Sequence, residues 1–230
     1  MTLRLSRPNG RTTRLPECRT PPLLQFPSVM PTAAKAAAVR SQRHKLAIRS
    51  FKQTRGMCGP ACLNIVFAYF GRRVSQKKIA KACGSTLASG TTGANLVRGA
   101  KKFGFAGRVS DHSNFRTIAK WLSRGVPIIV DWMSTVPTRA SGHMACGHYS
   151  VVSGLEKGHI ILQDPAIGGR RRVSRKAFLN VWFDFKSIFP KQADDLVIRR
   201  MIIVGPEELI GSLEPSQPMT NDKTIPKQAT

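Results

Sequence analysis

One stretch decides the fold of this chain: Gln53-Thr54-Arg55-Gly56-Met57-Cys58-Gly59-Pro60-Ala61-Cys62, followed directly by Leu63-Asn64-Ile65-Val66-Phe67-Ala68-Tyr69-Phe70-Gly71. Apolar residues cover most of the circumference of its second half, which predicts a buried helix that ends at Gly71. Pro60 fits the first turn of a helix, where a missing N–H costs nothing. Cys58 is therefore predicted at the helix N-terminus, where unpaired N–H groups and the helix dipole favour a thiolate.

Cys58 is a candidate nucleophile because the thiolate is the reactive form of cysteine and a Gly-containing loop precedes it. The alternative is that Cys58 is a small buried hydrophobic residue, as most free cysteines are. Cys62 follows one turn later on an apolar face, and we expect it in the core together with Cys83. Cys146 stands at the entry to a predicted strand, where no helix dipole would activate it.

The composition limits the classes of function. Among 230 residues, 37 Lys and Arg oppose 12 Asp and Glu, a formal net charge of +25. This favours an anionic partner or surface, but the charge is dispersed and no aromatic residues alternate with it, so specific nucleic-acid binding is not expected. Five cysteines without a regular spacing indicate a reducing, cytoplasmic compartment and fit no zinc pattern. We therefore expect no cofactor or metal and, without a run of 18 apolar residues, no transmembrane segment.

The chain divides into three predicted parts. Residues 1–47 are a basic leader that we expect to be largely disordered, with a short basic helix capped by Thr32 that could contact an anionic surface. Met30 is an alternative start of the protein. Residues 48–205 form the one folded domain, and residues 206–230 form a tail without a core pattern, except for a possible short helical piece.

Within the domain, helix patterns come first and strand patterns second. Helices are predicted over residues 58–70, 74–84, 93–103 and 114–123, with Ser75 and Ser113 as N-caps. Strands are predicted over residues 126–132, 147–155, 159–164 and 197–204, with a polar loop over 134–145 and a short helix or extended segment over 178–185. The order predicts an α+β domain in which N-terminal helices pack on a C-terminal antiparallel sheet.

Two polar residues on the predicted strands are candidates for partners of the cysteine. A three-residue hairpin loop at 156–158 would pair Ser150 with Asp164 and place His148 on the same face as Asp164, roughly 7–8 Å away. Asp164 could then orient the His148 ring and stabilise its charged form. A two-residue loop would put them on opposite faces. The structural alternatives are a polar histidine at a strand end and an Asx turn before Pro165.

Gly147 and His143, which lie near His148 in the sequence, also bear on the candidate site. Gly147 would leave room beside His148 for a substrate backbone. His143, in the predicted polar loop, is the rival candidate for the base.

In these motifs the chain resembles a known family, the papain-like cysteine peptidases that process bacteriocin precursors at double-glycine leaders, and their stand-alone relatives. The matching pieces stand in the family's order: Gln53 upstream of Cys58-Gly59-Pro60-Ala61-Cys62, then Gly147-His148-Tyr149-Ser150-Val151-Val152, then Asp164-Pro165. The resemblance covers about residues 48–205 and implies the papain-like fold. No ATPase or membrane segment is present in the sequence, which favours the stand-alone form.

The resemblance also implies roles for four residues. Cys58 would be the nucleophile, His148 the base, Asp164 the orienting acid, and Gln53 the oxyanion-hole donor beside the Cys58 backbone N–H. Four residues separate Gln53 from Cys58, one fewer than the family pattern has, so Gln53 reaches the site only if the loop tightens.

We therefore expect a cysteine peptidase that cleaves a peptide or protein substrate through a Cys58 thioester, with leader peptides as the family's substrates. One alternative is a non-catalytic peptide-binding module of the same fold, which the short spacing after Gln53 favours. Another is a different acyl transfer, such as deamidation, because the same three side chains can perform it.

Overall fold

The structure is a computed structural model that describes residues 45–137, 143–186 and 192–211. The expectations for the leader, with its Thr32 helix and the alternative start at Met30, lie outside the described residues. The same holds for most of the predicted tail and for the side chain of His143.

The described residues form a six-stranded, fully antiparallel sheet in the order β1-β8-β2-β3-β4-β5. Its strands are β1 (Ala106–Ser110), β2 (Ile128–Pro137), β3 (His143–Glu156), β4 (His159–Asp164), β5 (Gly169–Ser174) and β8 (Met201–Gly205). Two short strands, β6 (Phe183–Phe185) and β7 (Leu196–Ile198), pair separately. Residues Ala193–Asp195 form a 3-10 turn before β7.

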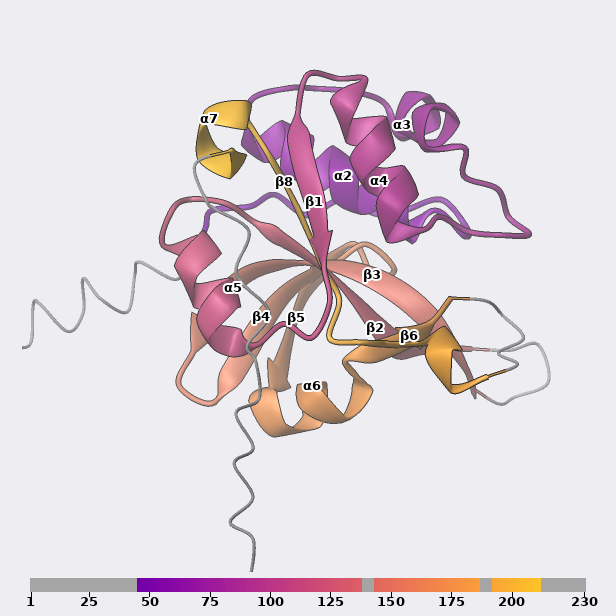
Figure 1. Cartoon of the computed structure of the whole chain (residues 1–230), viewed down its shortest axis with the longest axis vertical. Helices are drawn as coiled ribbons and strands as arrows, with labels where there is room; N and C mark the ends of the chain where they lie inside the picture. The colour runs from indigo at the N-terminus through magenta and orange to yellow at the C-terminus, as the bar shows by residue number, and fades with distance from the viewer. Residues whose placement is uncertain (1–44, 138–142, 187–191, 212–230) are drawn as a thin grey trace, which may run out of the picture.

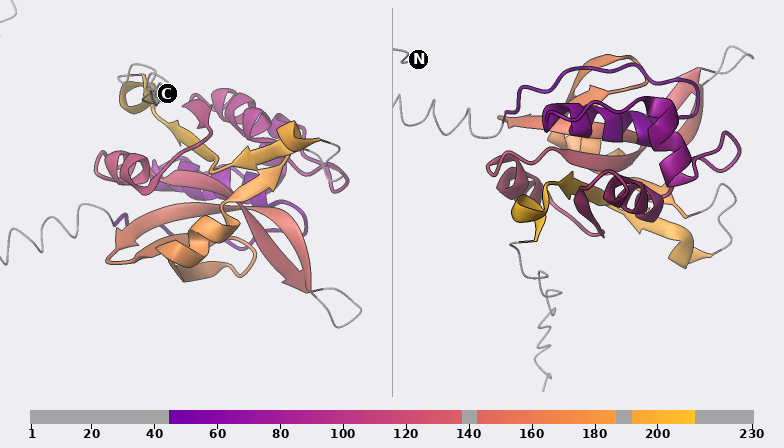
Figure 2. Two further views of the ribbon diagram at one scale, coloured as in Figure 1. Left: turned by 60° about the horizontal axis from the view of Figure 1, so that its bottom comes forward. Right: turned by 90° about the horizontal axis from the view of Figure 1, so that it is seen from above.

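Helices cover both faces of this sheet (Figure 1, Figure 2). One face carries α2 (Cys58–Tyr69), α3 (Gln76–Cys83) and α4 (Gly93–Lys101), and the other carries α5 (Phe115–Leu122), α6 (Arg175–Val181) and α7 (Glu207–Ile210). Alternate residues of a strand point to opposite faces, so Ile129 of β2 joins the core under α2 while Ile128 and Val130 join the other core. The expected α+β arrangement, with N-terminal helices on an antiparallel sheet, is confirmed.

The caps of the helices follow the sequence closely. The Ser75 hydroxyl accepts a hydrogen bond from the Lys78 N–H, and Gly84 ends α3 in a left-handed conformation with φ 67°. At α5 the expected cap is wrong by one residue. Asn114 accepts from Thr117 N–H at 3.0 Å, because the Ser113 hydroxyl is already donated to the Ser110 carbonyl at 3.1 Å.

The structure corrects the expected loop and the last expected strand, and it resolves the expected segment over 178–185. The supposed loop over 134–145 is largely the end of the β2–β3 hairpin, which pairs as far as Pro137↔His143. The supposed single strand over 197–204 divides into β7 and β8, because Arg199 takes a positive φ of 50° between them. The segment 178–185 divides into the end of α6 and β6, and strands β1 and β5 were not predicted.

The β3–β4 hairpin differs from the expected loop but keeps the expected register at the site. Glu156 pairs with His159, so the loop has two residues and not three. The register then shifts between Val152 and Gly154, a β-bulge that places one extra residue in β3. Beyond the bulge Val151 pairs with Gln163, which is the register that the three-residue loop would have given.

The packed unit extends a few residues past both expected domain boundaries. At the N-terminal side, the Leu46 N–H donates to the Ser153 carbonyl at 2.7 Å, and Leu46 packs against the core. At the C-terminal side, Ile210 of α7 is buried in the same core. The three-part division itself stays a prediction.

Candidate active site

Cys58 is the first residue of α2, half-buried at its N-terminus as the sequence predicted. The buried side chain of Gln76 fixes the preceding loop. Its Nε2 donates to the Met57 carbonyl at 3.0 Å, and its Oε1 accepts from the Thr54 N–H at 3.1 Å. Gln76 was missed by the sequence analysis because it lies on a different helix, 18 residues after Cys58.

His148 and Asp164 meet directly, so the expected pairing of these two side chains is confirmed. His148 Nε2 lies 2.8 Å from Asp164 Oδ1, and both side chains are almost fully buried. Because Nε2 faces Asp164, Nδ1 is the ring nitrogen left for the Cys58 sulfur. The Trp132 ring packs edge-on against the His148 ring, with centroids 5.7 Å apart.

Asp164 has three different hydrogen-bond donors. Besides His148, the Ala166 N–H donates to Oδ1 at 2.9 Å and Arg171 Nε donates to Oδ2 at 2.8 Å. Burial alone would raise the pKa of Asp164, but the hydrogen bonds and positive charges around it lower that pKa below its ordinary value. Asp164 is therefore a buried carboxylate that stays ionised.

The His148 ring favours its charged form because it interacts with the ionised Asp164. Burial alone would lower the pKa of His148, but the interactions with Asp164 and with the Cys58 sulfur outweigh burial and raise this pKa to about 9. A histidine in this setting is an imidazolium at neutral pH.

Gln53 lies beside the end of β4. Its backbone N–H donates to the Pro165 carbonyl at 2.9 Å, which ties the loop before Cys58 to the residue that follows Asp164. Its side-chain Oε1 is buried without a hydrogen-bond partner in the part of the chain that the structure describes. The structure therefore brings the Gln53 backbone to the site, while its side-chain amide is not held by a hydrogen bond through Oε1.

Three further cysteines lie in the described part of the chain. Cys62 is fully buried, and burial raises the pKa of its thiol well above the ordinary value. Burial likewise raises the pKa of Cys83 to about 11, so both are core residues as expected. Cys146 is half-buried, and burial together with Cys58 raises its pKa too.

A second pair of acids lies on the other side of the site. Asp131 of β2 is 3% exposed, and its Oδ1 has no partner among the described residues. Burial, with the nearby carboxyl of Asp184, raises the pKa of Asp131 well above its ordinary value. The Asp184 carboxylate also occupies the space where a Cβ of Gly147 would stand. The expectation that Gly147 leaves room for substrate is therefore wrong, because Asp184 takes that room.

Comparisons with known proteins come from sequence and from structure. Residues 40–188 match the Peptidase C39-like family. No curated protein matches the chain closely enough to be a relative. A double glycine motif protease from an AMS/PCAT transporter, solved in complex with the leader peptide, shares the fold with a TM-score of 0.52 and 17% identity, over 71% of this chain and 95% of that one.

Two more solved structures are similar. The peptidase domain of Streptococcus ComA, a bi-functional ABC transporter involved in quorum sensing, gives a TM-score of 0.48 and 23% identity, over 69% of this chain and 97% of that one. A protein of Bacillus anthracis described as C39-like gives 0.49 and 15%, over 69% and 94%. No helix in the described part of this chain has the length and apolar character of a membrane span. The match covers well over half of the chain, so the protein belongs to the Peptidase C39-like family.

Proposed function

We propose that the protein is a cysteine peptidase that cleaves a peptide bond through a thioester on Cys58. One observation carries this proposal: a cysteine at a helix N-terminus lies beside a buried, ionised histidine–aspartate pair. These are the three side chains that thiol-based acyl transfer needs, and the helix N-terminus adds unpaired N–H groups.

In the proposed reaction, the Cys58 thiolate attacks the carbonyl carbon of the scissile bond while His148 holds a proton on Nδ1. The negative charge moves to the carbonyl oxygen, where the Cys58 backbone N–H and the Gln53 amide would stabilise it. His148 then donates its proton to the leaving amine, and the C–N bond breaks to leave a thioester. Water, deprotonated by His148, attacks the thioester and releases the acid product and the thiolate.

Asp164 acts through His148 in this scheme. By accepting from Nε2 it fixes which nitrogen faces the sulfur and keeps the ring positively charged before attack. Arg171 and the Ala166 N–H also donate to the Asp164 carboxylate, so both of its oxygens accept hydrogen bonds and its orientation is fixed.

We further propose that the substrates are leader peptides. Two findings support this substrate class: membership of the Peptidase C39-like family, and a protein of the same fold that was solved in complex with the leader peptide. The proposed reaction itself requires only that a peptide bond of the substrate lies next to the Cys58 sulfur.

A second candidate is a peptide-binding module without catalysis. The observation that favours it is the spacing of four residues between Gln53 and Cys58, together with a Gln53 side chain whose Oε1 has no partner. In that case the oxyanion would lack one of its two donors, and loss of one donor costs about 10²–10³-fold in rate.

The test is cleavage of a synthetic precursor peptide with a Gly-Gly leader, followed by mass spectrometry. We expect the wild-type protein and the control Cys146→Ala to cleave it, and Cys58→Ala to lose cleavage while still binding the peptide. Full cleavage by Cys58→Ala would refute the peptidase proposal. Binding without cleavage by the wild type would favour the second candidate.

A further inference from the structure

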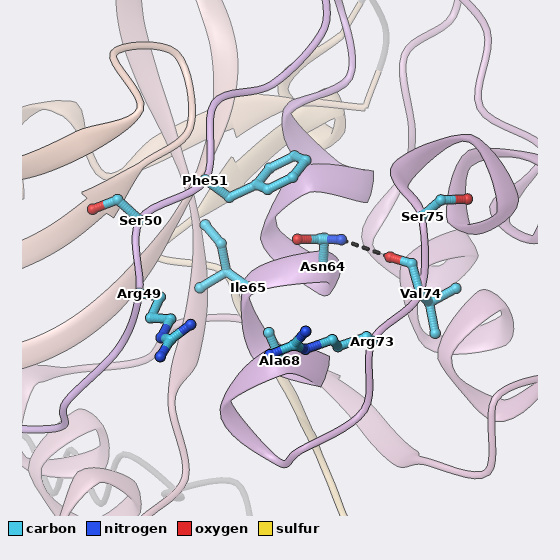
Figure 3. A pocket seen from close by; sticks show the side chains of 9 residues that line it. All are labelled: Arg49, Ser50, Phe51, Asn64, Ile65, Ala68, Arg73, Val74 and Ser75. Atoms are coloured by element: carbon cyan, nitrogen blue, oxygen red, sulfur yellow. Dashed lines mark hydrogen bonds between the residues drawn. The ribbon is translucent and has the colours of Figure 1, made fainter.

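A pocket of about 400 Å³ lies on the side of α2 away from the sheet, between the segment that enters the domain and the connection from α2 to α3 (Figure 3). Its apolar wall comes from Phe51, Ile65 and Val74. The pocket is separate from the candidate active site. Residues 64–68 lie six to ten positions after Cys58 on the same helix, about 9–15 Å along its axis.

Two arginines line this pocket with no acid to balance them. Arg49 and Arg73 enter from opposite sides, and Figure 3 shows both guanidinium groups extended toward the same end of the pocket. Neither takes part in an ion pair or a side-chain hydrogen bond in the part of the chain that the structure describes, and no Asp or Glu lines the pocket. Two like charges that face one space favour an anionic group between them.

Asn64 adds a polar group between the apolar wall and the arginines. Its Nδ2 donates to the Val74 carbonyl at 2.6 Å, which fixes the amide and leaves Oδ1 directed into the pocket (Figure 3). A fixed amide oxygen in this position is an acceptor for a backbone N–H. The pocket thus offers an apolar wall, an acceptor for a peptide group and two cations.

From this combination we propose that the pocket is a docking site for a short acidic segment of a partner protein, in which an apolar side chain stands next to an Asp or Glu. The apolar side chain would pack against Phe51 and Ile65, and the carboxylate would bridge Arg49 and Arg73. Arginine suits this role because its planar group binds a carboxylate with two parallel hydrogen bonds. The net charge of +25 would attract such an acidic partner over a longer range.

The pocket wall is joined to the candidate active site by hydrogen bonds. The Ser50 hydroxyl donates to Gln163 Oε1 at 2.9 Å, next to Asp164, and the Gln53 N–H donates to the Pro165 carbonyl. A docked segment would therefore lie against the same stretch of chain that leads to Gln53 and Cys58. The proposal does not depend on cleavage, because binding at the pocket needs none of the site residues.

The experiment measures binding of two fluorescently labelled probe peptides by anisotropy: acetyl-Gly-Phe-Asp-Leu-Glu amide and its neutral counterpart with Asn and Gln. We expect the acidic peptide to bind about 10-fold or more tightly than the neutral one, since a charge-assisted hydrogen bond is about twice as strong as a neutral one. Arg49→Gln with Arg73→Gln should reduce binding to the level of the neutral peptide. Arg72→Gln, an exposed arginine that does not line the pocket, is the matched control and should leave binding unchanged.

A second variant distinguishes binding in the pocket from general attraction to the positively charged surface. Ala68 is exposed and lines the pocket, so Ala68→Trp should fill it and weaken binding about as much, with an unchanged circular dichroism spectrum. Equal binding of both peptides, no binding of either, or an unchanged affinity in the double arginine variant would overturn the proposal. So would an acidic peptide that blocks alkylation of Cys58, because it would then occupy the active site.

Discussion

Two buried aspartates in the same sheet have pKa values shifted in opposite directions. Asp164 at the end of β4 and Asp131 in β2 are 1% and 3% exposed. Asp164 faces donors, namely His148, the Ala166 N–H and Arg171, and its pKa is lowered despite burial. Asp131 faces a second carboxyl, Asp184, and burial together with that neighbour raises its pKa. The donors around Asp164 therefore outweigh the effect of burial on its pKa, whereas at Asp131 a second carboxyl adds to the effect of burial.

The difference bears on the site because Asp164 contacts His148, while Asp131 lies opposite Tyr149, the residue that follows His148 in β3. An ionised Asp164 keeps His148 charged and oriented, whereas Asp131 has no contact with His148 among those that the structure shows. The predictions below test this contrast, starting with the substitution that should have the largest effect.

Asp164→Asn should reduce cleavage by about 10²–10⁴-fold, because the amide neither fixes the His148 tautomer nor stabilises the imidazolium. The measurement is kcat/KM on the precursor peptide, with Asp131→Asn as the matched control. Equal losses in the two variants would show that the contrast between the two acids is wrong.

The same substitution should lower the free energy of unfolding by about 3 kcal/mol at pH 5.5, because it removes one partner of a buried ion pair. The raised pKa of His148 contributes stability that is fully present below its ordinary value of 6.5 and is lost as the pH rises through about 9. The lowered pKa of Asp164 contributes stability that is present above 3.8 and is lost as the pH falls through its lowered value.

Urea denaturation of the wild type and Asp164→Asn at pH 5.5 and pH 10 checks this. The difference in unfolding free energy between the two proteins should shrink at the higher pH. A difference that is constant between the two pH values would contradict the proposed charge on His148.

Arg171→Gln should lower kcat/KM about 10-fold and move the acid limb of its pH profile upward, because Asp164 loses a charged donor. The neighbouring Arg172 is the control, since it pairs with the half-buried Glu156 at 2.9 Å and not with the site. Arg172→Gln should leave the profile unchanged, and Arg171→Lys should restore part of the rate. Identical pH profiles for Arg171→Gln and Arg172→Gln would show that Arg171 does not act on Asp164.

Asp131→Asn should have the smallest effect and the opposite sign. The raised pKa of Asp131 costs stability at any pH above its ordinary value of 3.8, because the unfolded chain is ionised there. An amide removes that cost, and the unfolding free energy at pH 8 should rise by about 1 kcal/mol, with kcat/KM within twofold of the wild type. A clear loss of stability in a thermal melt at pH 8 would mean that Asp131 is ionised.

Local sequence patterns predicted the reactive side chains of the site but not the residues that hold them in place. The helix that begins at Cys58 and the strand that ends at Asp164 each follow from a continuous run of sequence, so both were predictable. The expected register beyond the bulge, where Val151 pairs with Gln163, is correct for a reason that the sequence does not reveal, because a β-bulge offsets the shorter loop.

The supports of the site depend on contacts between distant segments. Gln76 holds the loop before Cys58 from another helix, and Asp184 reaches Gly147 from the separate β6–β7 pair. Arg171 stands in a run of three arginines that is typical of a solvated surface. Strand periodicity would have put Arg171 on the opposite face from its neighbours, but the strand itself, β5, was not predicted.

The central claim is that Cys58 is activated by the charged His148, and its most direct test is alkylation by iodoacetamide across pH 6–9, followed by peptide mapping. We predict that Cys58 is labelled first, because it stands at a helix N-terminus beside the charged His148, whereas Cys62 and Cys83 are buried in the core. His148→Ala should abolish that early labelling. Labelling of Cys146 or Cys83 with Cys58 untouched would contradict the account.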